Sequence, residues 1–374
     1  MLKRILIAYS STPPLIRFLR PAFERAGIDT ECVLAEQNTH FDRLVIHPIN
    51  KWAHNLRVIP KSKNLFELHP LAHKNYRSTL LQQAIRNFDP DLVLLIRGLG
   101  FRDWALKEAK TKFAWWTEKE ERVDEALREL HEFDWYFFMS SSCVDTARLA
   151  GHANIGYLSH AVDSDFFRPI PGINKELDFC FVGRWSEKRQ TYMEAALDIT
   201  DNAAIYGGNW VKKNWCRPRF RKVIKGKFID DEPLVELYNK SKIIINVSNW
   251  GLGEGKNRTG MNMRVFEAPA TGSFLLTDES REMNSVVTPG EHVGTFTGLD
   301  EFCSKLKYYL SHDSERERIA RQGMEQVRTS NSYDHLVSII IDTYDEVCRA
   351  ACFPIAGNPV VDARGACPPD SLEF

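Results

Sequence analysis

Residues 89–117 read DPDLVLLIRGLGFRDWALKEAKTKFAWWT, and this stretch decides the fold class. Asp89 and Pro90 predict a turn, and the apolar run over 91–96 predicts a buried strand. A helical pattern over 102–110 and a second apolar strand over 112–117 follow. Two continuous apolar strands joined by a helix are typical of a parallel sheet that is covered on both faces.

The same alternation of strand and helix extends in both directions from this stretch. Further strands are predicted over 4–9, 30–35, 135–140, 177–182, 203–206, 243–247, 273–277 and 292–296. The stretch 37–66 is rich in His, Asn and Pro and predicts an irregular excursion. The alternation predicts an α/β protein with doubly wound, Rossmann-like sheets.

A second interruption of this rhythm marks a domain boundary. The connector from Pro169 to Gly172 separates two runs of alternating elements. The last segment, from Phe353, is rich in Pro, Gly and small residues. We therefore predict domains over 1–168 and 169–330, a C-terminal helix over 331–350 that packs back on the first domain, and a disordered tail over 351–374.

The composition excludes several classes of protein. The 374 residues contain 49 Lys or Arg and 50 Asp or Glu, so the chain lacks the basic excess of a bulk nucleic-acid binder. Its eight cysteines form no C-x-x-C pair and predict free thiols. No secretion signal and no apolar run of membrane-spanning length is found, so we predict a cytoplasmic protein.

Four blocks in the second half of the chain carry a family resemblance. They are 157–163 with 167–169, 181–184 with Lys188, 260–268 with 271–272 and 275–278, and 290–291 with 315–320 and Gly323. In this order they resemble the CgeB-like, spore-maturation-related branch of the GT-B glycosyltransferases, and also the group 1 or family 4 enzymes. Residues 1–150 match only in general style.

The resemblance implies a division of labour between two domains that face each other across a cleft. Residues 1–168 would bind the acceptor, and residues 169–330 would bind a nucleotide-diphosphate sugar. The expected activity is metal-independent sugar transfer, with a UDP-sugar favoured as co-substrate and no other cofactor. The acceptor class is left open among glycans, proteins, lipid-linked molecules and small molecules.

The donor-binding residues are named by position within these blocks. Glu267 matches the carboxylate that holds the ribose hydroxyls, although a Glu in the first turn of a helix is also favoured by the helix dipole. Arg184 and Lys188 match a cationic pair on the diphosphate, with Arg189 as an alternative to Lys188. The other expected donor contacts are Gly183, Gly260, Met261, Asn262 and Arg264.

The catalytic residues are less strongly indicated. His160 lies at the expected cleft hinge, and a purely structural His is an equal alternative. Glu118 follows a strand and is a candidate base, although a helix-terminal carboxylate is at least as frequent there. Family 4 enzymes carry a second Glu eight positions before the ribose Glu. Here that position is Thr259, so the stereochemical outcome stays open.

Three further stretches are candidates for contact with the acceptor, the phosphates or a membrane. Ser10 to Thr12 are capping residues that also border the expected acceptor site. The glycines of 249–255 would let backbone amides approach a phosphate. The basic stretch 212–227 is more often a solvated face, with peripheral membrane contact as the alternative.

Metal ligands and other activities were also considered. Asp163 and Asp165 form a D-x-D string inside the hinge block, where the resemblance predicts structure and no metal. A nucleotide-sugar epimerase of the same fold and a catalytically degenerate scaffold protein remain as alternative functions.

Overall fold

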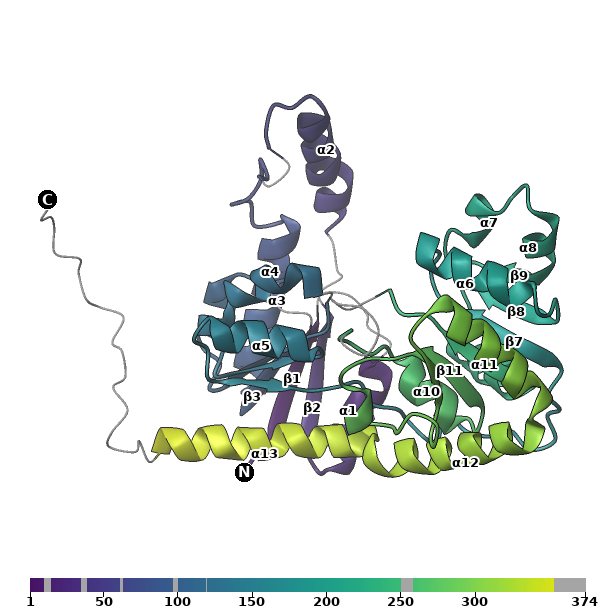
Figure 1. Cartoon of the computed structure of the whole chain (residues 1–374). Coiled ribbons are helices and arrows are strands. Elements are labelled where there is room, and N and C mark those ends of the chain that lie inside the picture. Colours follow the sequence, from purple (N-terminus) through teal and green to yellow (C-terminus); the bar gives the residue numbers. More distant parts are fainter. Residues whose placement is uncertain are drawn as a thin grey trace, which may run out of the picture.

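The computed structural model describes residues 1–9, 15–34, 39–60, 63–96, 100–118, 120–249 and 258–352. The predicted tail from 353, Ser10 to Thr12 and most of the 249–255 loop lie outside these residues. Two six-stranded sheets lie side by side (Figure 1).

The first sheet is entirely parallel and has the strand order β2-β1-β3-β4-β5-β6. Its strands are β1 (Arg4–Tyr9), β2 (Asp29–Leu34), β3 (Leu92–Ile96), β4 (Lys112–Trp116), β5 (Trp135–Phe138) and β6 (Ile155–Tyr157). Its helices are α1 (Ile16–Arg25), α2 (His47–Asn55), α3 (His73–Phe88), α4 (Val123–Leu127) and α5 (Ser141–Leu149).

The second sheet is also parallel, with the order β12-β11-β10-β7-β8-β9. Its strands are β7 (Leu177–Val182), β8 (Ala203–Tyr206), β9 (Ile224–Gly226), β10 (Ser241–Asn246), β11 (Phe274–Asp278) and β12 (Gly294–Phe296). Its helices are α6 (Glu187–Leu197), α7 (Trp210–Lys213), α8 (Pro218–Val223), α9 (Asp231–Lys240), α10 (Arg264–Ala270), α11 (Leu299–Ser311) and α12 (Asp313–Ser330).

Alternate residues of the central strands belong to two different cores. Ile5 and Leu94 lie in one apolar cluster, and Leu6 and Val93 lie in another on the opposite face. Both faces of the first sheet are therefore buried, which explains why its strands are continuous apolar runs. The predicted α/β class with two doubly wound sheets is confirmed.

Two local predictions were wrong. The predicted helix over 102–110 is a short 3-10 turn, Asp103–Leu106, between β3 and β4. The stretch 37–66 is not irregular, because it contains a π-helical turn, Asp42–Ile46, that continues into α2. The buried face of this helix combines apolar and polar side chains, and large apolar side chains are exposed on its other face.

The last helix, α13 (Tyr333–Cys352), continues from α12 and lies against α1. Figure 1 shows it running beneath the first sheet. The ring of Phe18 on α1 lies 5.6 Å from that of Tyr333 on α13 and 5.3 Å from that of Phe166. An apolar contact thus joins the first sheet to the segment that links the two sheets.

A polar contact joins the two units on the other side of this linker. Glu282 accepts hydrogen bonds from the hydroxyl of Ser141 at 2.6 Å and from the amide of Gly260 at 3.0 Å. Arg281 pairs with Asp145 at 2.6 Å. Hydrogen bonds and packing therefore both fix the distance between the carboxyl ends of the two sheets.

Candidate functional site

A cavity of about 480 Å³ lies where the carboxyl ends of strands from both sheets meet. Thr117 follows β4 of the first sheet, and Val182 ends β7 of the second. His160 reaches the cavity from the segment after β6, and Arg264 and Glu267 reach it from α10. In open α/β sheets, ligands bind at this edge, which is what the sequence analysis predicted for the cleft.

Glu267 is a buried carboxylate that faces this cavity. Among the described residues, none donates a hydrogen bond to its side chain, and burial raises its pKa to about 7. The hydroxyl of Tyr238, which also lines the cavity, is buried and has no hydrogen-bond partner among the described residues. Buried polar groups normally form hydrogen bonds, so the Glu267 carboxylate and the Tyr238 hydroxyl together indicate that a polar ligand binds here.

Three arginines, Arg184, Arg189 and Arg264, line the same cavity. The guanidinium of Arg264 donates from Nη1 to the side-chain oxygen of Asn246 at 2.7 Å. Arg189 donates to the carbonyl oxygens of Val247 at 2.8 Å and Arg184 at 2.7 Å. Burial and the nearby positive charge of Arg264 lower the pKa of Arg189 to about 9. A bound anion would offset this repulsion between like charges.

Gly183 lies between two of these guanidinium groups. A Cβ atom at this position would lie 3.1 Å from Nη1 of Arg189 and 3.2 Å from Nη2 of Arg264. The absence of a side chain therefore allows both cations to approach the end of β7. The predicted role of Gly183 as a donor contact is consistent with this geometry and stays a prediction.

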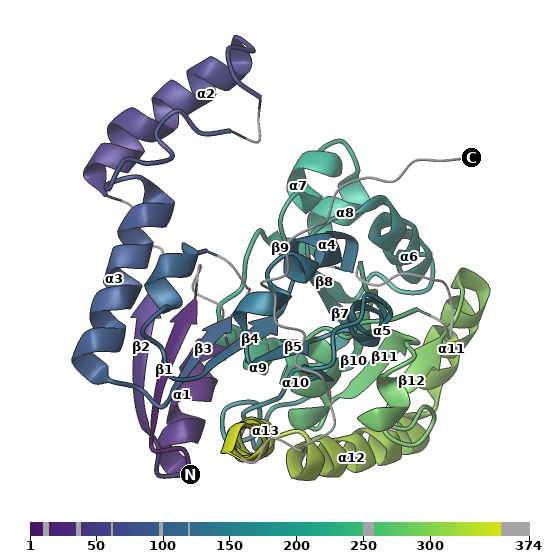
Figure 2. The same cartoon turned by 90° about the vertical axis from the view of Figure 1, so that its left-hand side faces the viewer.

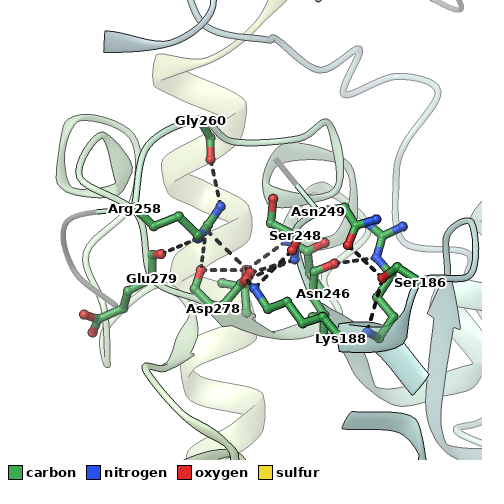
Figure 3. Close-up of polar contacts among 12 residues, drawn as sticks. Ser186, Lys188, Asn246, Ser248, Asn249, Arg258, Gly260, Asp278 and Glu279 are labelled. Carbon is green, nitrogen blue, oxygen red and sulfur yellow. Dashed lines mark hydrogen bonds and ion pairs between the residues drawn. The ribbon is translucent and has the colours of Figure 1, made fainter. Parts of the chain in front are cut away.

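Lys188 lies in a different network, shown in Figure 3. Its ammonium group lies 3.0 Å from the carboxylate of Asp278 and donates to the carbonyl of Ser248 at 3.1 Å. Of the two alternatives that the sequence left open, the structure brings Arg189 to the cavity and gives Lys188 an acidic partner at the end of β11.

The segment 260–262 precedes α10, which begins at Arg264. The amide of Gly260 donates to Glu282, and Met261 is buried in the core. The side chain of Asn262 lines the cavity and donates to Asn246 at 2.9 Å. The structure thus commits the amide of Gly260 to the protein, and Asn262 faces the cavity through its side chain.

His160 lies between the main cavity and a smaller one of about 220 Å³. Its ring lies 6.4 Å from that of Trp115 and 6.5 Å from that of Phe266. Burial lowers its pKa to about 4, so the imidazole is neutral at pH 7. A neutral ring can both donate and accept a hydrogen bond in the cavity.

Glu118 follows the cavity-lining Thr117, and its carboxylate lies 3.2 Å from the guanidinium of Arg122. The next acidic residue described, Glu120, is buried and accepts a hydrogen bond from Thr259 at 2.7 Å. The position that carries a second Glu in family 4 is therefore occupied here by Thr259. Its hydroxyl donates to the carboxylate of Glu120, which lies on a 3-10 turn after β4.

The D-x-D string of the hinge block makes local contacts with the backbone. Asp163 accepts hydrogen bonds from the amides of Asp165 at 3.1 Å and Phe166 at 2.9 Å, so this D-x-D string forms a turn. Within the described ranges, no group of three or more His, Cys, Asp or Glu side chains could hold a metal ion.

Both the sequence and the fold of this chain are similar to those of known proteins. Residues 168–342 match the family described as "Glycosyl transferase-like". The chain is 22% identical over 293 residues to the spore protein CgeB of Bacillus subtilis. This alignment covers 73% of this chain and 88% of CgeB.

Similar solved structures cover nearly the whole chain. Sucrose-phosphate synthase from Thermosynechococcus elongatus has a TM-score of 0.68 at 12% identity and covers 93% of this chain and all of that one. HepE from Anabaena, in complex with UDP and glucose, has a TM-score of 0.59 at 11% identity over 92% of this chain and 100% of HepE.

Within the described residues, no helix is both long and apolar enough to cross a membrane.

Proposed function

We propose that this CgeB-like protein with the GT-B glycosyltransferase fold transfers a sugar from a nucleoside-diphosphate sugar, with a UDP-sugar favoured, to an acceptor hydroxyl without a metal ion. One observation carries the proposal. In a cavity between the two sheets, the buried Glu267 carboxylate lacks a donor among the described residues and shares the space with three arginines. That arrangement suits a ligand with hydroxyls at one end and negative charge at the other.

In this proposal Glu267 accepts hydrogen bonds from the two ribose hydroxyls, because one carboxylate can accept from two neighbouring donors. The Tyr238 hydroxyl, which is free in the described structure, completes the polar wall. Arg184 and Arg264 hold the diphosphate, and Arg189 adds a fixed charge behind them. These cations stabilise the charge that develops on the leaving diphosphate, the role that a metal ion plays in other transferases.

The acceptor would approach from the first sheet. His160 and Thr117 line the cavity on that side, and Glu118 is adjacent. A neutral His160 is suited to orient the acceptor hydroxyl, and Glu118 remains our candidate for the base that takes its proton. HepE was solved with UDP and glucose. The presence of UDP and glucose in HepE supports a nucleotide sugar as one substrate of this chain. For the acceptor we propose a glycan.

The two alternative functions are less favoured. An epimerase needs dedicated acids and bases around the sugar. Of the two described carboxylates that line the cavity, Asp231 is paired with Arg17 at 3.2 Å and Glu267 is assigned to the ribose. A degenerate scaffold protein would not be expected to keep three arginines around a cavity of this size.

A thermal-shift panel of UDP, GDP, ADP, CMP and dTDP, with and without magnesium, tests the proposal. One diphosphate at about 100 times its Kd should stabilise the protein by about 2.7 kcal/mol, with or without magnesium. Glu267→Gln should reduce this shift strongly, because an amide accepts poorly from two hydroxyls. Glu317→Gln, on the exposed face of α12, should bind as the wild type does. Absence of any shift with all five nucleotides would refute the proposal.

The raised pKa of Glu267 makes donor binding depend on pH. The carboxylate must ionise to accept two hydroxyl hydrogen bonds, and its pKa is about 7 in the empty protein. Raising the pH through 7 therefore favours binding. Affinity for UDP-glucose should increase about tenfold between pH 6 and pH 8, because the ionised fraction increases by that factor.

Titration calorimetry with UDP-glucose measures this effect without interference, since its diphosphate does not change charge in that range. Glu267→Gln should have weak affinity that does not vary with pH. An equally steep pH profile in Glu267→Gln would assign the titration to another group.

A further inference from the structure

Residues 39–60 and 63–72, here called the arm, leave the body of the protein between β2 and α3. Figures 1 and 2 show α2 at the far end of the arm, projecting away from both sheets. The arm contains the π-helical turn Asp42–Ile46 and α2, followed by a return segment toward α3. It lines neither of the two cavities next to His160.

The arm carries an unusual concentration of exposed apolar side chains. Of the 15 large hydrophobic residues that are exposed in the described chain, nine lie in the arm. Leu44 is 69% exposed, Trp52 is 62% exposed and Leu56 is 55% exposed. Together with Phe41, these residues recur at spacings of three, eight and four, so they lie on one face of the helix. We call these four residues the apolar stripe.

The opposite face of the same helix is the one that packs against the rest of the arm. Asp42, Ile46, Asn50 and Ala53 are buried there. The side chain of Asn50 donates to that of Asn64 at 2.7 Å and accepts from the amide of Leu65 at 2.9 Å. The helix is therefore already packed. On its other face Leu44, Trp52 and Leu56 point to solvent in the single chain, and the ring of Phe41 stacks on that of His69 at 5.1 Å.

The arm also carries exposed positive charge. Arg43, Lys51, Arg57 and Lys63 are exposed. The two acidic residues of the arm are both engaged. The carboxylate of Asp42 accepts from the amide of His73 at 3.0 Å, and Glu67 lies 3.2 Å from Arg102. A cavity of about 780 Å³ lies on the packed side of the helix, where Lys51, Lys63 and His54 line it together with Asp42 and Asn50.

We propose that the arm docks the protein on an anionic lipid surface, with the apolar stripe in the headgroup region and the basic residues on lipid phosphates. A packed helix with an exposed apolar face and flanking Lys and Arg is the pattern of an interfacial amphipathic helix. Charge complementarity favours anionic lipid over a second copy of the arm, because two copies would bring like charges together.

The basic stretch 212–227 is the other candidate for this role, and it differs from the arm in exposing one large apolar residue, Trp215, and in pairing two of its cations. There, Arg217 pairs with Glu194, and Arg219 pairs with Asp198 at 2.8 Å and with Asp201 at 2.5 Å. These ion pairs neutralise part of its charge on the same surface. In the arm, none of the four exposed cations forms an ion pair with a described residue.

Cosedimentation of the full chain with vesicles tests the proposal without requiring an active enzyme or a known substrate. The wild type should sediment with vesicles that contain phosphatidylglycerol, should sediment less with pure phosphatidylcholine, and should be released by salt. The double variant Leu44→Ser with Trp52→Ser should bind about tenfold less lipid, because two large apolar side chains leave the interface. Arg43→Glu with Lys51→Glu should also bind less.

Matched controls come from the stretch 212–227. Trp215 is 71% exposed, so Trp215→Ser removes a tryptophan as exposed as Trp52. Arg221→Glu with Lys222→Glu reverses two exposed charges, as in the arm variant. Both controls should bind vesicles as the wild type does. All substitutions are at exposed sites, so melting temperatures should stay unchanged.

Four results would overturn the proposal. The first is no cosedimentation of the wild type with anionic vesicles. The second is an equal loss in the 212–227 controls. The third is a dimer in light scattering that Trp52→Ser dissociates, without vesicle binding, which would assign the stripe to self-association. Binding of inorganic phosphate alone, without vesicle binding, would likewise contradict a lipid surface.

Discussion

Replacing Arg264 with Gln is expected to lower kcat for sugar transfer by about 10²-fold to 10³-fold, the usual loss when one fixed electrostatic donor is removed from a transition state. Arg264 lies one helical turn before Glu267 and lines the same cavity. Its Nη1 is fixed by Asn246 at 2.7 Å, so the guanidinium is oriented before the substrate binds. Such preorganisation costs no rearrangement at the moment when charge develops on the leaving diphosphate.

The measurement is the initial rate of nucleotide release from whichever nucleotide sugar stabilises the protein. KM should change much less than kcat, because the charge on the diphosphate is greater in the transition state. Arg264→Lys should have a kcat between those of Arg264→Gln and the wild type, because lysine keeps the positive charge but lacks the two parallel N–H donors of a guanidinium group. Arg221→Gln, an exposed arginine outside the cavity, is the control. Wild-type kcat in Arg264→Gln would remove Arg264 from the proposed mechanism.

The sequence predicted the sheets because their strands are buried on both faces. The predicted strands over 91–96 and 112–117 contain the unbroken apolar runs 92–96 and 113–116, and the structure places β3 and β4 there. The arm was missed for the opposite reason. Its buried face contains Asp42 and Asn50, whereas Trp52 is on the exposed face. A search for an apolar inner face does not find a helix that buries polar and apolar side chains together and exposes a tryptophan.

The candidate site was predictable where its residues lie within one short segment. Arg264 and Glu267 come from one block of the chain, and both line the cavity. The choice between Lys188 and Arg189 needed the structure. Neighbours on a helix point about 100° apart, and the phase of α6 is fixed by Ser186, whose hydroxyl accepts from the amide of Arg189.

Tyr238 was missed because nothing local marks it. It lies on α9 and meets the cavity only through the packing of that helix against the second sheet. Glu120 was missed for the same reason. Its contact with Thr259 joins residues 139 positions apart, and no local pattern predicts such a pair.

Replacing Asp278 with Ala is expected to lower the free energy of unfolding by about 3–5 kcal/mol, the usual cost of removing one partner from a buried ion pair. Asp278 is 6% exposed and accepts from the amide of Ser248 at 3.0 Å. Lys188 lies 3.0 Å from its carboxylate and Arg258, also buried, lies 3.5 Å away (Figure 3). The variant would remove the carboxylate that both cations approach.

Urea unfolding measures the effect, with Glu108→Ala as the control. Glu108 also pairs with an arginine, Arg86, but both side chains are largely exposed, and this control should unfold as the wild type does. Asp278→Asn should fall between the two, because the amide keeps an acceptor for Ser248 while it loses the charge. If Asp278→Ala were as stable as Glu108→Ala, the network would contribute no net stability. Ser248 and Arg258 lie 30 and 20 positions from Asp278 in the sequence, so the expected role of this network is to join distant parts of the second unit.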